Sequence, residues 1–137
     1  MENKQRVLNH IQKHPGQTLS QIHYRLKIPQ TTIKHHITQL ISENKIVKEE
    51  IFKTRYFLNG TNEELKIKSS IENNNNVKNI YQNLVNEMTL EEISLVCNTS
   101  KTLVSRRLKM LISKKIIEKT KKDGKIIFKK KIITQFS

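Results

Sequence analysis

The apolar positions of the first 60 residues predict three short helices followed by a pair of strands. Val7, Leu8 and Ile11 share one face of a first helix, which ends at Pro15-Gly16. Two further helices are predicted from apolar residues at helical spacing around 19–26 and 31–43, with a turn at Pro29 between them. After residue 45 the period shortens to that of strands, which are expected at 46–50 and 55–58.

The same pattern returns later in the chain, which indicates one fold used twice. A shift of 71 positions moves Leu19 onto Leu90 and places TLSQI at 18–22 on TLEEI at 89–93. No gap is needed up to Phe57, and the apolar pairs include Ile33 with Val104, Ile37 with Leu108, Leu40 with Leu111, Ile46 with Ile117 and Phe57 with Phe128. Helices are therefore expected at 77–87, 90–97 and 100–114. Strands are expected at 117–120 and 125–129, joined by an Asp-Gly turn.

These repeats predict a first domain at 1–60, a linker at 61–76 and a second domain at 77–137. The linker ends in the run Asn73 to Asn76, which favours neither helix nor strand, although a short helical stretch is expected at 63–71. The tail from residue 130 holds Ile132, Ile133 and Phe136. It either adds a strand, packs back on its domain or contacts a partner.

The net charge of the chain indicates which class of partner the fold binds. The chain has 26 Lys and Arg against 12 Asp and Glu, a net charge of +14 and a pI near 10.0. Residues 1–60 carry +6 and residues 77–137 carry +9, whereas the linker carries −1. Such a surplus attracts a polyanion, either nucleic acid or an anionic membrane, although solubility alone also favours lysine. The charge lies in the repeated units, where a nucleic-acid site needs it.

Two sequence stretches resemble the winged helix-turn-helix family, over about 7–58 and again over about 77–129. TTIKHHITQLISENKIVKEE at 31–50 is similar to the recognition helix, helix end and first wing strand of MarR-type and ArsR-type regulators. Two such units in one chain also resemble small archaeal regulators. The resemblance implies a mainly α fold with small β-hairpin wings (α+β), made of two tandem winged helix-turn-helix domains. It also implies sequence-specific binding of double-stranded DNA in transcription regulation.

Winged helices have other uses, so two alternatives stay open. One is a replication initiator or general transcription factor, and the other is a protein-interaction scaffold. If the function is regulation, the chain reads DNA either as a homodimer or as an intramolecular pseudo-dimer.

The third helix of each unit is the expected reader of DNA, because a helix of about 12 residues fits the major groove. With Ile33, Ile37 and Leu40 facing inward, the outer and flanking positions of the first unit are Thr31, Thr32, Lys34, His35, His36 and Gln39. The corresponding positions of the second unit are Ser100, Lys101, Thr102, Ser105, Arg106, Arg107 and Lys109. Neither set contains an acid. Arginine can bind guanine through two hydrogen bonds, and lysine and serine can hold phosphates.

The two hairpin wings are the second candidate surface. Lys53 and Arg55 lie in the first, whereas Lys121, Lys122 and Lys125 crowd the second together with Lys119. Lysines with few aromatic residues favour phosphate contact over base stacking. The alternative is an ordinary polar turn.

Other chemistry has little support in the sequence. His10 and His14 have the i, i+4 spacing of a metal pair but lack further ligands, so no metal and no cofactor are expected. Cys97 aligns with Leu26 and is expected in the core, and a single cysteine fits a reducing cytosol. The three Gly of the chain form no phosphate-binding loop, and no catalytic set stands out. We therefore expect a cytoplasmic, non-enzymatic protein with no membrane association.

Overall fold

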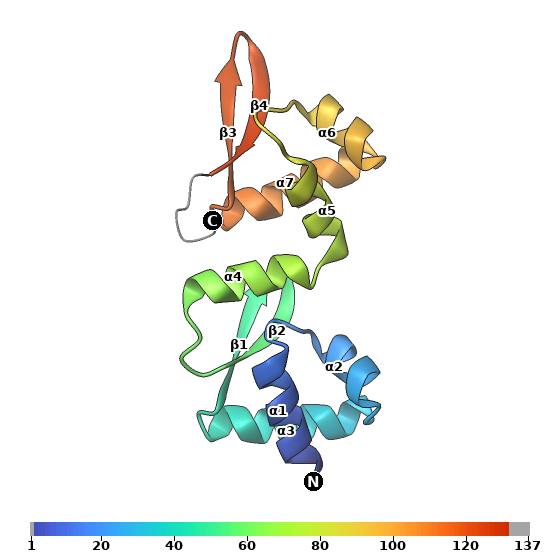
Figure 1. Ribbon diagram of the computed structural model, residues 1–137, viewed down its shortest axis with the longest axis vertical. Helices are drawn as coiled ribbons and strands as arrows, with labels where there is room; N and C mark the ends of the chain where they lie inside the picture. Colours follow the sequence, from blue (N-terminus) through green and yellow to red (C-terminus); the bar gives the residue numbers. More distant parts are fainter. Residues whose placement is uncertain (1, 132–137) are drawn as a thin grey trace. The chain divides into compact units, whose positions relative to one another are not determined.

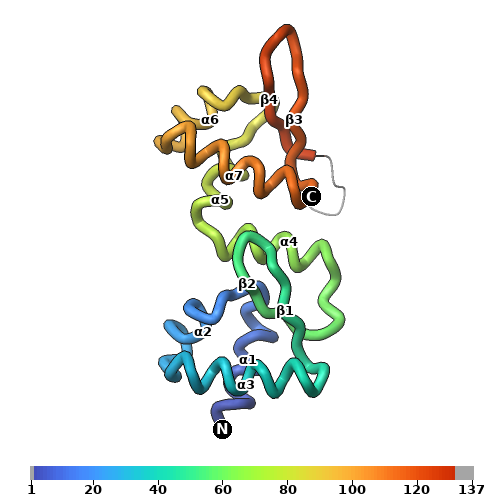
Figure 2. The backbone as a smooth tube through the Cα atoms, turned by 180° about the vertical axis from the view of Figure 1, so that it is seen from behind, coloured from blue at the N-terminus to red at the C-terminus, as the bar shows by residue number. Residues whose placement is uncertain are grey.

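The computed structural model describes residues 2–131 and divides the chain into two compact units, Met1–Asn73 and Asn74–Ser137. Each unit contains three helices followed by a two-stranded antiparallel hairpin (Figures 1 and 2). This arrangement is that of a winged helix-turn-helix, and it confirms the α+β fold class predicted from the sequence. Residues 132–137, which include most of the tail discussed above, lie outside the described part.

The first unit packs its first three helices around an aliphatic core, and a fourth helix follows the hairpin. Its elements are α1 (Asn3–Lys13), α2 (Leu19–Leu26), α3 (Gln30–Ser42), β1 (Ile46–Ile51), β2 (Lys53–Leu58) and α4 (Glu63–Glu72). The core combines Val7, Ile11, Ile22, Ile28, Ile33, Ile37, Leu40 and Ile46, all at most 3% exposed. The inward face predicted for the third helix, with Ile33, Ile37 and Leu40, is confirmed.

The second unit repeats this plan with different residues. Its elements are α5 (Asn75–Asn83), α6 (Leu90–Cys97), α7 (Lys101–Ser113), β3 (Ile117–Lys122) and β4 (Lys125–Lys130). Its buried residues include Val77, Ile80, Leu84, Ile93, Val104, Leu108, Leu111 and Ile117. Cys97 is buried as predicted, and burial raises the pKa of its thiol above the ordinary value.

The second helix of each unit begins with the same capping device. Thr18 and Thr89 each accept a hydrogen bond from the backbone N–H three residues on, and Gln21 and Glu92 accept one from the capping residue's own N–H. Each helix ends on a residue in the left-handed conformation, Lys27 with φ 57° and Asn98 with φ 50°. Local interactions therefore fix where the second helix of each unit begins and where it ends.

We expect Thr89→Ala to lower the free energy of unfolding of the second unit by about 1 kcal/mol, because the cap is lost. Thr102→Ala, at an exposed position of α7, is the matched control and should change stability by less than about 0.5 kcal/mol.

Capping also lowers the pKa of Glu92 below its ordinary value of 4.5, chiefly through the Thr89 N–H. The contribution of Glu92 should therefore be present above pH 4.5 and be lost as the pH falls through the lowered pKa. Urea denaturation at neutral and acidic pH tests both points, and equal stability of the two variants at neutral pH would contradict the capping role.

The two hairpins differ in their turns, which corrects the ungapped alignment of the repeats. In the first hairpin Ile51 pairs with Lys53 around Phe52 alone. In the second Lys122 pairs with Lys125 around Asp123-Gly124, both with positive φ, as the Asp-Gly signal predicts. The second turn is thus one residue longer. Lys48 faces Tyr56 and its equivalent Lys119 faces Phe128, so Phe128 corresponds to Tyr56 and not to Phe57.

The predicted linker at 61–76 holds regular structure, and part of it belongs to the first unit. Asn62 caps α4 by accepting from Leu65 N at 2.8 Å, and Figure 1 shows α4 beside the β1–β2 hairpin. Lys66 Nζ lies 2.8 Å from Glu49 Oε1, and Asn73 Nδ2 donates to Pro15 O at 3.1 Å. Ile71 is only 6% exposed. These contacts explain why the boundary between the units falls after residue 73.

The first helix of the second unit also differs from its prediction. Helix α5 ends at Asn83, whereas the pattern predicted helix to residue 87. Asn83 Nδ2 donates to Asn79 O at 2.8 Å, and Asn86 has a φ of 55°. Asparagine side chains bind nearby backbone in this way and favour the end of a helix over its continuation.

Candidate nucleic-acid interface

Helix α7 presents a basic outer surface because its apolar residues are turned into the core. Val104, Leu108 and Leu111 are at most 1% exposed. Of the residues predicted to face DNA, Lys101, Thr102, Arg106 and Lys109 are exposed, whereas Ser105 and Arg107 are partly buried. Ser100 is exposed as well, but its hydroxyl oxygen caps α7 by accepting from Leu103 N at 3.3 Å.

Two adjoining hollows lie along α7 and run toward the second wing. The first is lined by Leu90, Lys101, Thr102, Ser105, Arg106 and Lys109. The second is lined by Thr89, Leu90, Glu91, Ser105, Lys119, Gly124, Lys125, Ile126 and Phe128. They share the lining residues Leu90 and Ser105 and are together called here the α7–wing groove. Five Lys and Arg line it against Glu91, and Glu91 Oε1 is 3.9 Å from Lys101 Nζ.

The lysines of the second wing are not equivalent. Lys121 and Lys125 are exposed near the turn. Lys122 is exposed too, but its Nζ lies 2.8 Å from Glu87 Oε2, and this contact lowers the pKa of Glu87. Part of the Lys122 charge is therefore neutralised within the protein. Lys121 and Lys125 are the freer candidates for phosphate.

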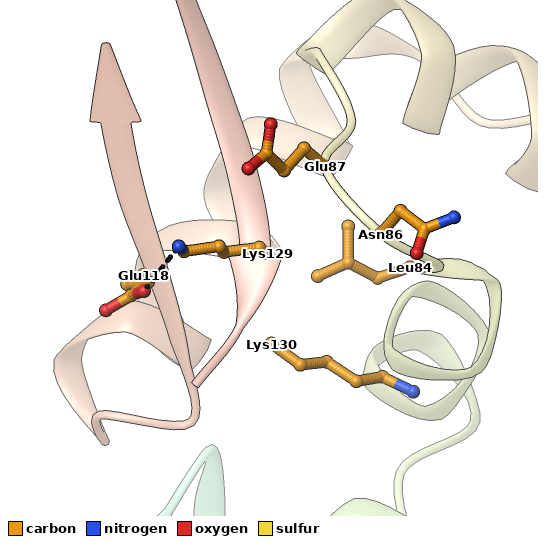
Figure 3. Close-up of a pocket in the computed structure, with 6 residues that line it drawn as sticks. All are labelled: Leu84, Asn86, Glu87, Glu118, Lys129 and Lys130. Carbon is orange, nitrogen blue, oxygen red and sulfur yellow. Dashed lines mark ion pairs between the residues drawn. The ribbon is translucent and has the colours of Figure 1, made fainter. Parts of the chain in front are cut away.

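Another hollow of the second unit has mixed charge and is a poor match for a polyanion. Figure 3 shows Glu118 and Lys129 on the hairpin side and Leu84, Asn86 and Glu87 on the other, with the Glu118–Lys129 ion pair at 3.3 Å. Lys130 also lines this hollow, and its Nζ lies 4.3 Å from the centre of the Tyr81 ring. Two acids and two lysines in one small space leave no net charge to attract phosphate.

Helix α3 carries fewer cations than α7. Thr31, Lys34 and His35 are exposed, whereas Thr32, His36 and Gln39 are partly buried. Nδ1 of His36 is buried without a hydrogen-bond partner within residues 2–131. Thr38 is exposed on the same stripe and was missed by the sequence reasoning. Its spacing from Thr31 and Lys34, by seven and four residues, is the signal that could have identified it.

Arg55 corrects the prediction for the first wing. It is 0% exposed, and its Nε and Nη1 donate to Ile51 O and Gly16 O, each at 2.8 Å. Burial lowers the pKa of its guanidinium from the ordinary value. The side chain therefore joins the hairpin to the loop after α1 and does not face DNA. Lys53 is exposed as predicted.

Acidic residues reduce the charge of the first wing further. Glu49 and Glu50 lie on β1, where they face Arg55 and Thr54 across the hairpin. The carboxylate of Glu49 also forms an ion pair with Lys66 of α4. The first wing is therefore less suited to phosphate than the second.

Within residues 2–131 no three His, Cys, Asp or Glu side chains gather as metal ligands, and no helix has the length and apolar character to cross a bilayer. His10 is buried, and its Nε2 donates to Gln17 Oε1 at 2.6 Å. The ring of His14 lies 4.7 Å from that of His10, centroid to centroid. His10 is thus packed in the first unit, whereas His14 is exposed.

Comparison with known proteins supports the helix-turn-helix assignment. Residues 1–66 match a family described as an N-terminal HTH domain. The match spans the three helices and the hairpin of the first unit and ends before the second unit begins. It supports a helix-turn-helix regulator that binds DNA. No curated protein matches the chain.

Proposed function

We propose that this protein is a transcription regulator that binds double-stranded DNA sequence-specifically through both winged-helix units. Residues of α3 and α7 enter major grooves, and lysines of the wings hold the phosphate backbone. The observation that carries the proposal is the α7–wing groove, where a recognition helix and a wing present Lys and Arg to two adjoining hollows. A helix provides base contacts and a lysine-rich hairpin provides phosphate contacts. DNA-binding proteins commonly separate these two kinds of contact in this way.

The two units contribute unequally in this proposal. The outer surface of α7 carries four Lys and Arg, namely Lys101, Arg106, Arg107 and Lys109, whereas that of α3 carries Lys34 alone. The second wing adds Lys119, Lys121 and Lys125, whereas the first combines Lys48 and Lys53 with two glutamates. Affinity for the phosphate backbone comes chiefly from the second unit. The first unit adds base contacts from Thr31, His35 and Gln39. The expected site is therefore asymmetric.

The units 1–73 and 74–137 act as two DNA-binding domains in this scheme, and the protein functions in the cytoplasm without a cofactor. Two arrangements fit: one chain reading both halves of a site, or two chains pairing on it. The alternatives are a replication initiator or general transcription factor, and a scaffold that binds protein only.

The test is the salt dependence of DNA binding, measured by fluorescence anisotropy. The binding of a duplex from upstream of the protein's own gene is compared with that of a shuffled duplex. The Lys121→Ala/Lys125→Ala variant should reduce the slope of log K against log salt by about 2, because two phosphate contacts are lost. Lys13→Ala/Lys68→Ala removes two exposed lysines from α1 and α4 and is the matched control, which should keep the slope.

Specific regulation predicts a preference of about 10³ or more for the cognate duplex. Equal slopes in both variants would contradict the role of the second wing. Absence of binding to either duplex at low salt would overturn the DNA proposal and favour the scaffold.

A further inference from the structure

The second helix of each unit exposes a large apolar side chain at the same position. Leu95 on α6 is 82% exposed and Tyr24 on α2 is 78% exposed, the two highest values among the exposed large apolar residues of the described part. They are related by the shift of 71 positions that superposes the repeats. Val96, next to Leu95, is 52% exposed. Neither helix needs such residues for its own core, since Ile22 and Ile93 supply the buried face. Leu95 and Val96 together form an exposed apolar surface on α6, whereas Tyr24 is the exposed aromatic residue of α2.

The two outer faces carry opposite charges and different apolar side chains. On α2 the face consists of Ser20, Gln21, Tyr24 and Arg25, and with Gln17 these residues line a hollow. On α6 the matching positions are Glu91, Glu92, Leu95 and Val96, all exposed. One face is thus basic, aromatic and hollowed, whereas the other is acidic and aliphatic with a projecting leucine. Glu91 is only loosely paired with Lys101, at 3.9 Å between two exposed side chains.

We propose that α2 of one copy of this chain docks on α6 of a second copy. An antiparallel crossing of the two helices places Arg25, near the end of α2, against Glu91, near the start of α6. Leu95 then enters the hollow beside Tyr24. Each chain carries both faces, so one contact of this kind is enough to join two copies. The occupant is a second copy because this chain itself supplies the matching face, and its net positive charge leaves few other acidic surfaces to receive Arg25.

The docking requires no DNA and is tested without it. Sedimentation velocity over a wide concentration range should show that the wild-type chain forms a weak, concentration-dependent dimer. Arg25→Glu and Glu91→Arg should each weaken dimerisation by about tenfold or more, because like charges then face one another. The double variant Arg25→Glu/Glu91→Arg restores the opposite-charge pair and should recover most of the wild-type affinity.

The recovery is the decisive result, because damage to folding by one substitution would not be repaired by the other. Lys13→Glu reverses one exposed charge on α1 and is the control, which should leave dimerisation unchanged. Glu92 is left in place because it belongs to the α6 cap. A wild-type monomer at every concentration, equal dimerisation in all variants, or additive losses in the double variant would each overturn the proposal. These sedimentation results do not test the DNA-binding proposal, which rests on the cations of α7 and the second wing. Because Glu91 lines the α7–wing groove, the Glu91→Arg variant is not used to judge DNA affinity.

Discussion

Replacing Arg106 with alanine is expected to weaken binding of the cognate duplex by about 5- to 150-fold, which corresponds to about 1–3 kcal/mol. The side chain is exposed on α7 and lines the α7–wing groove. It lies two residues from the inward-facing Val104 and Leu108, at the middle of the helix, and is therefore on the side turned away from the core. Binding to a shuffled duplex should fall much less, so the ratio of specific to non-specific affinity should decrease.

Arg106→Lys separates base recognition from charge. Lysine keeps the positive charge but loses the planar fork that binds guanine through two hydrogen bonds. The lysine variant should therefore retain non-specific binding and its salt dependence but lose preference for the cognate sequence. Equal losses on cognate and shuffled duplexes in the alanine variant, with full rescue by lysine, would instead assign Arg106 to the phosphate backbone. No loss on either duplex would remove it from the interface.

The helices could be predicted from the sequence because apolar periodicity reports burial directly. Ile33, Ile37 and Leu40 and their counterparts Val104, Leu108 and Leu111 are all nearly inaccessible, as their spacing indicates. The turn between α2 and α3 was also readable, since Pro29 disfavours helix at the residue before it. Once these helices are placed, the exposed side of α3 and α7 follows by elimination.

The strand register of the second wing relative to the first could not be predicted. The ungapped alignment of the two repeats pairs two identical residues, although it is wrong in the hairpins. Placing Phe57 on Phe128 needs no gap, but the longer Asp123-Gly124 turn moves β4 by one residue. A single-residue change in a hairpin turn reverses which side chains face the core. The apolar identity of Tyr56, Phe57, Ile127 and Phe128 concealed this shift. Docking of α4 was likewise hidden, because it depends on contacts with Glu49 and Pro15 that are distant in sequence.

The burial of Arg55 could be predicted from the sequence only in part. Phe57 is fully buried, and side chains two residues apart on a strand share a face, so position 55 also points inward. The prediction instead placed Arg55 on the surface of the wing because of its charge. The two carbonyl groups that accept its hydrogen bonds belong to Ile51 and Gly16, and no local pattern brings Gly16 to the wing.

Arg55→Ala is expected to lower the free energy of unfolding of the first unit by about 2–4 kcal/mol. The substitution removes two hydrogen bonds from a charged donor, leaves two carbonyl oxygens short of a partner and opens a void at a fully buried position. The relief of the buried charge offsets part of this loss. Since the two units need not unfold together, native-state hydrogen exchange read separately for residues 2–73 and 74–131 is the appropriate measurement.

Two variants distinguish a structural Arg55 from the DNA contact that its place in the wing suggests. Lys53→Ala, two residues away and exposed, should change stability by less than about 0.5 kcal/mol. Arg55→Lys should have an intermediate effect, because one ammonium group on a differently shaped side chain cannot reach both carbonyl groups as the guanidinium does. Exchange in the second unit should stay unchanged throughout. A stable Arg55→Ala variant with weakened DNA affinity would place the guanidinium at the interface and refute its role as the link between the hairpin and the loop after α1.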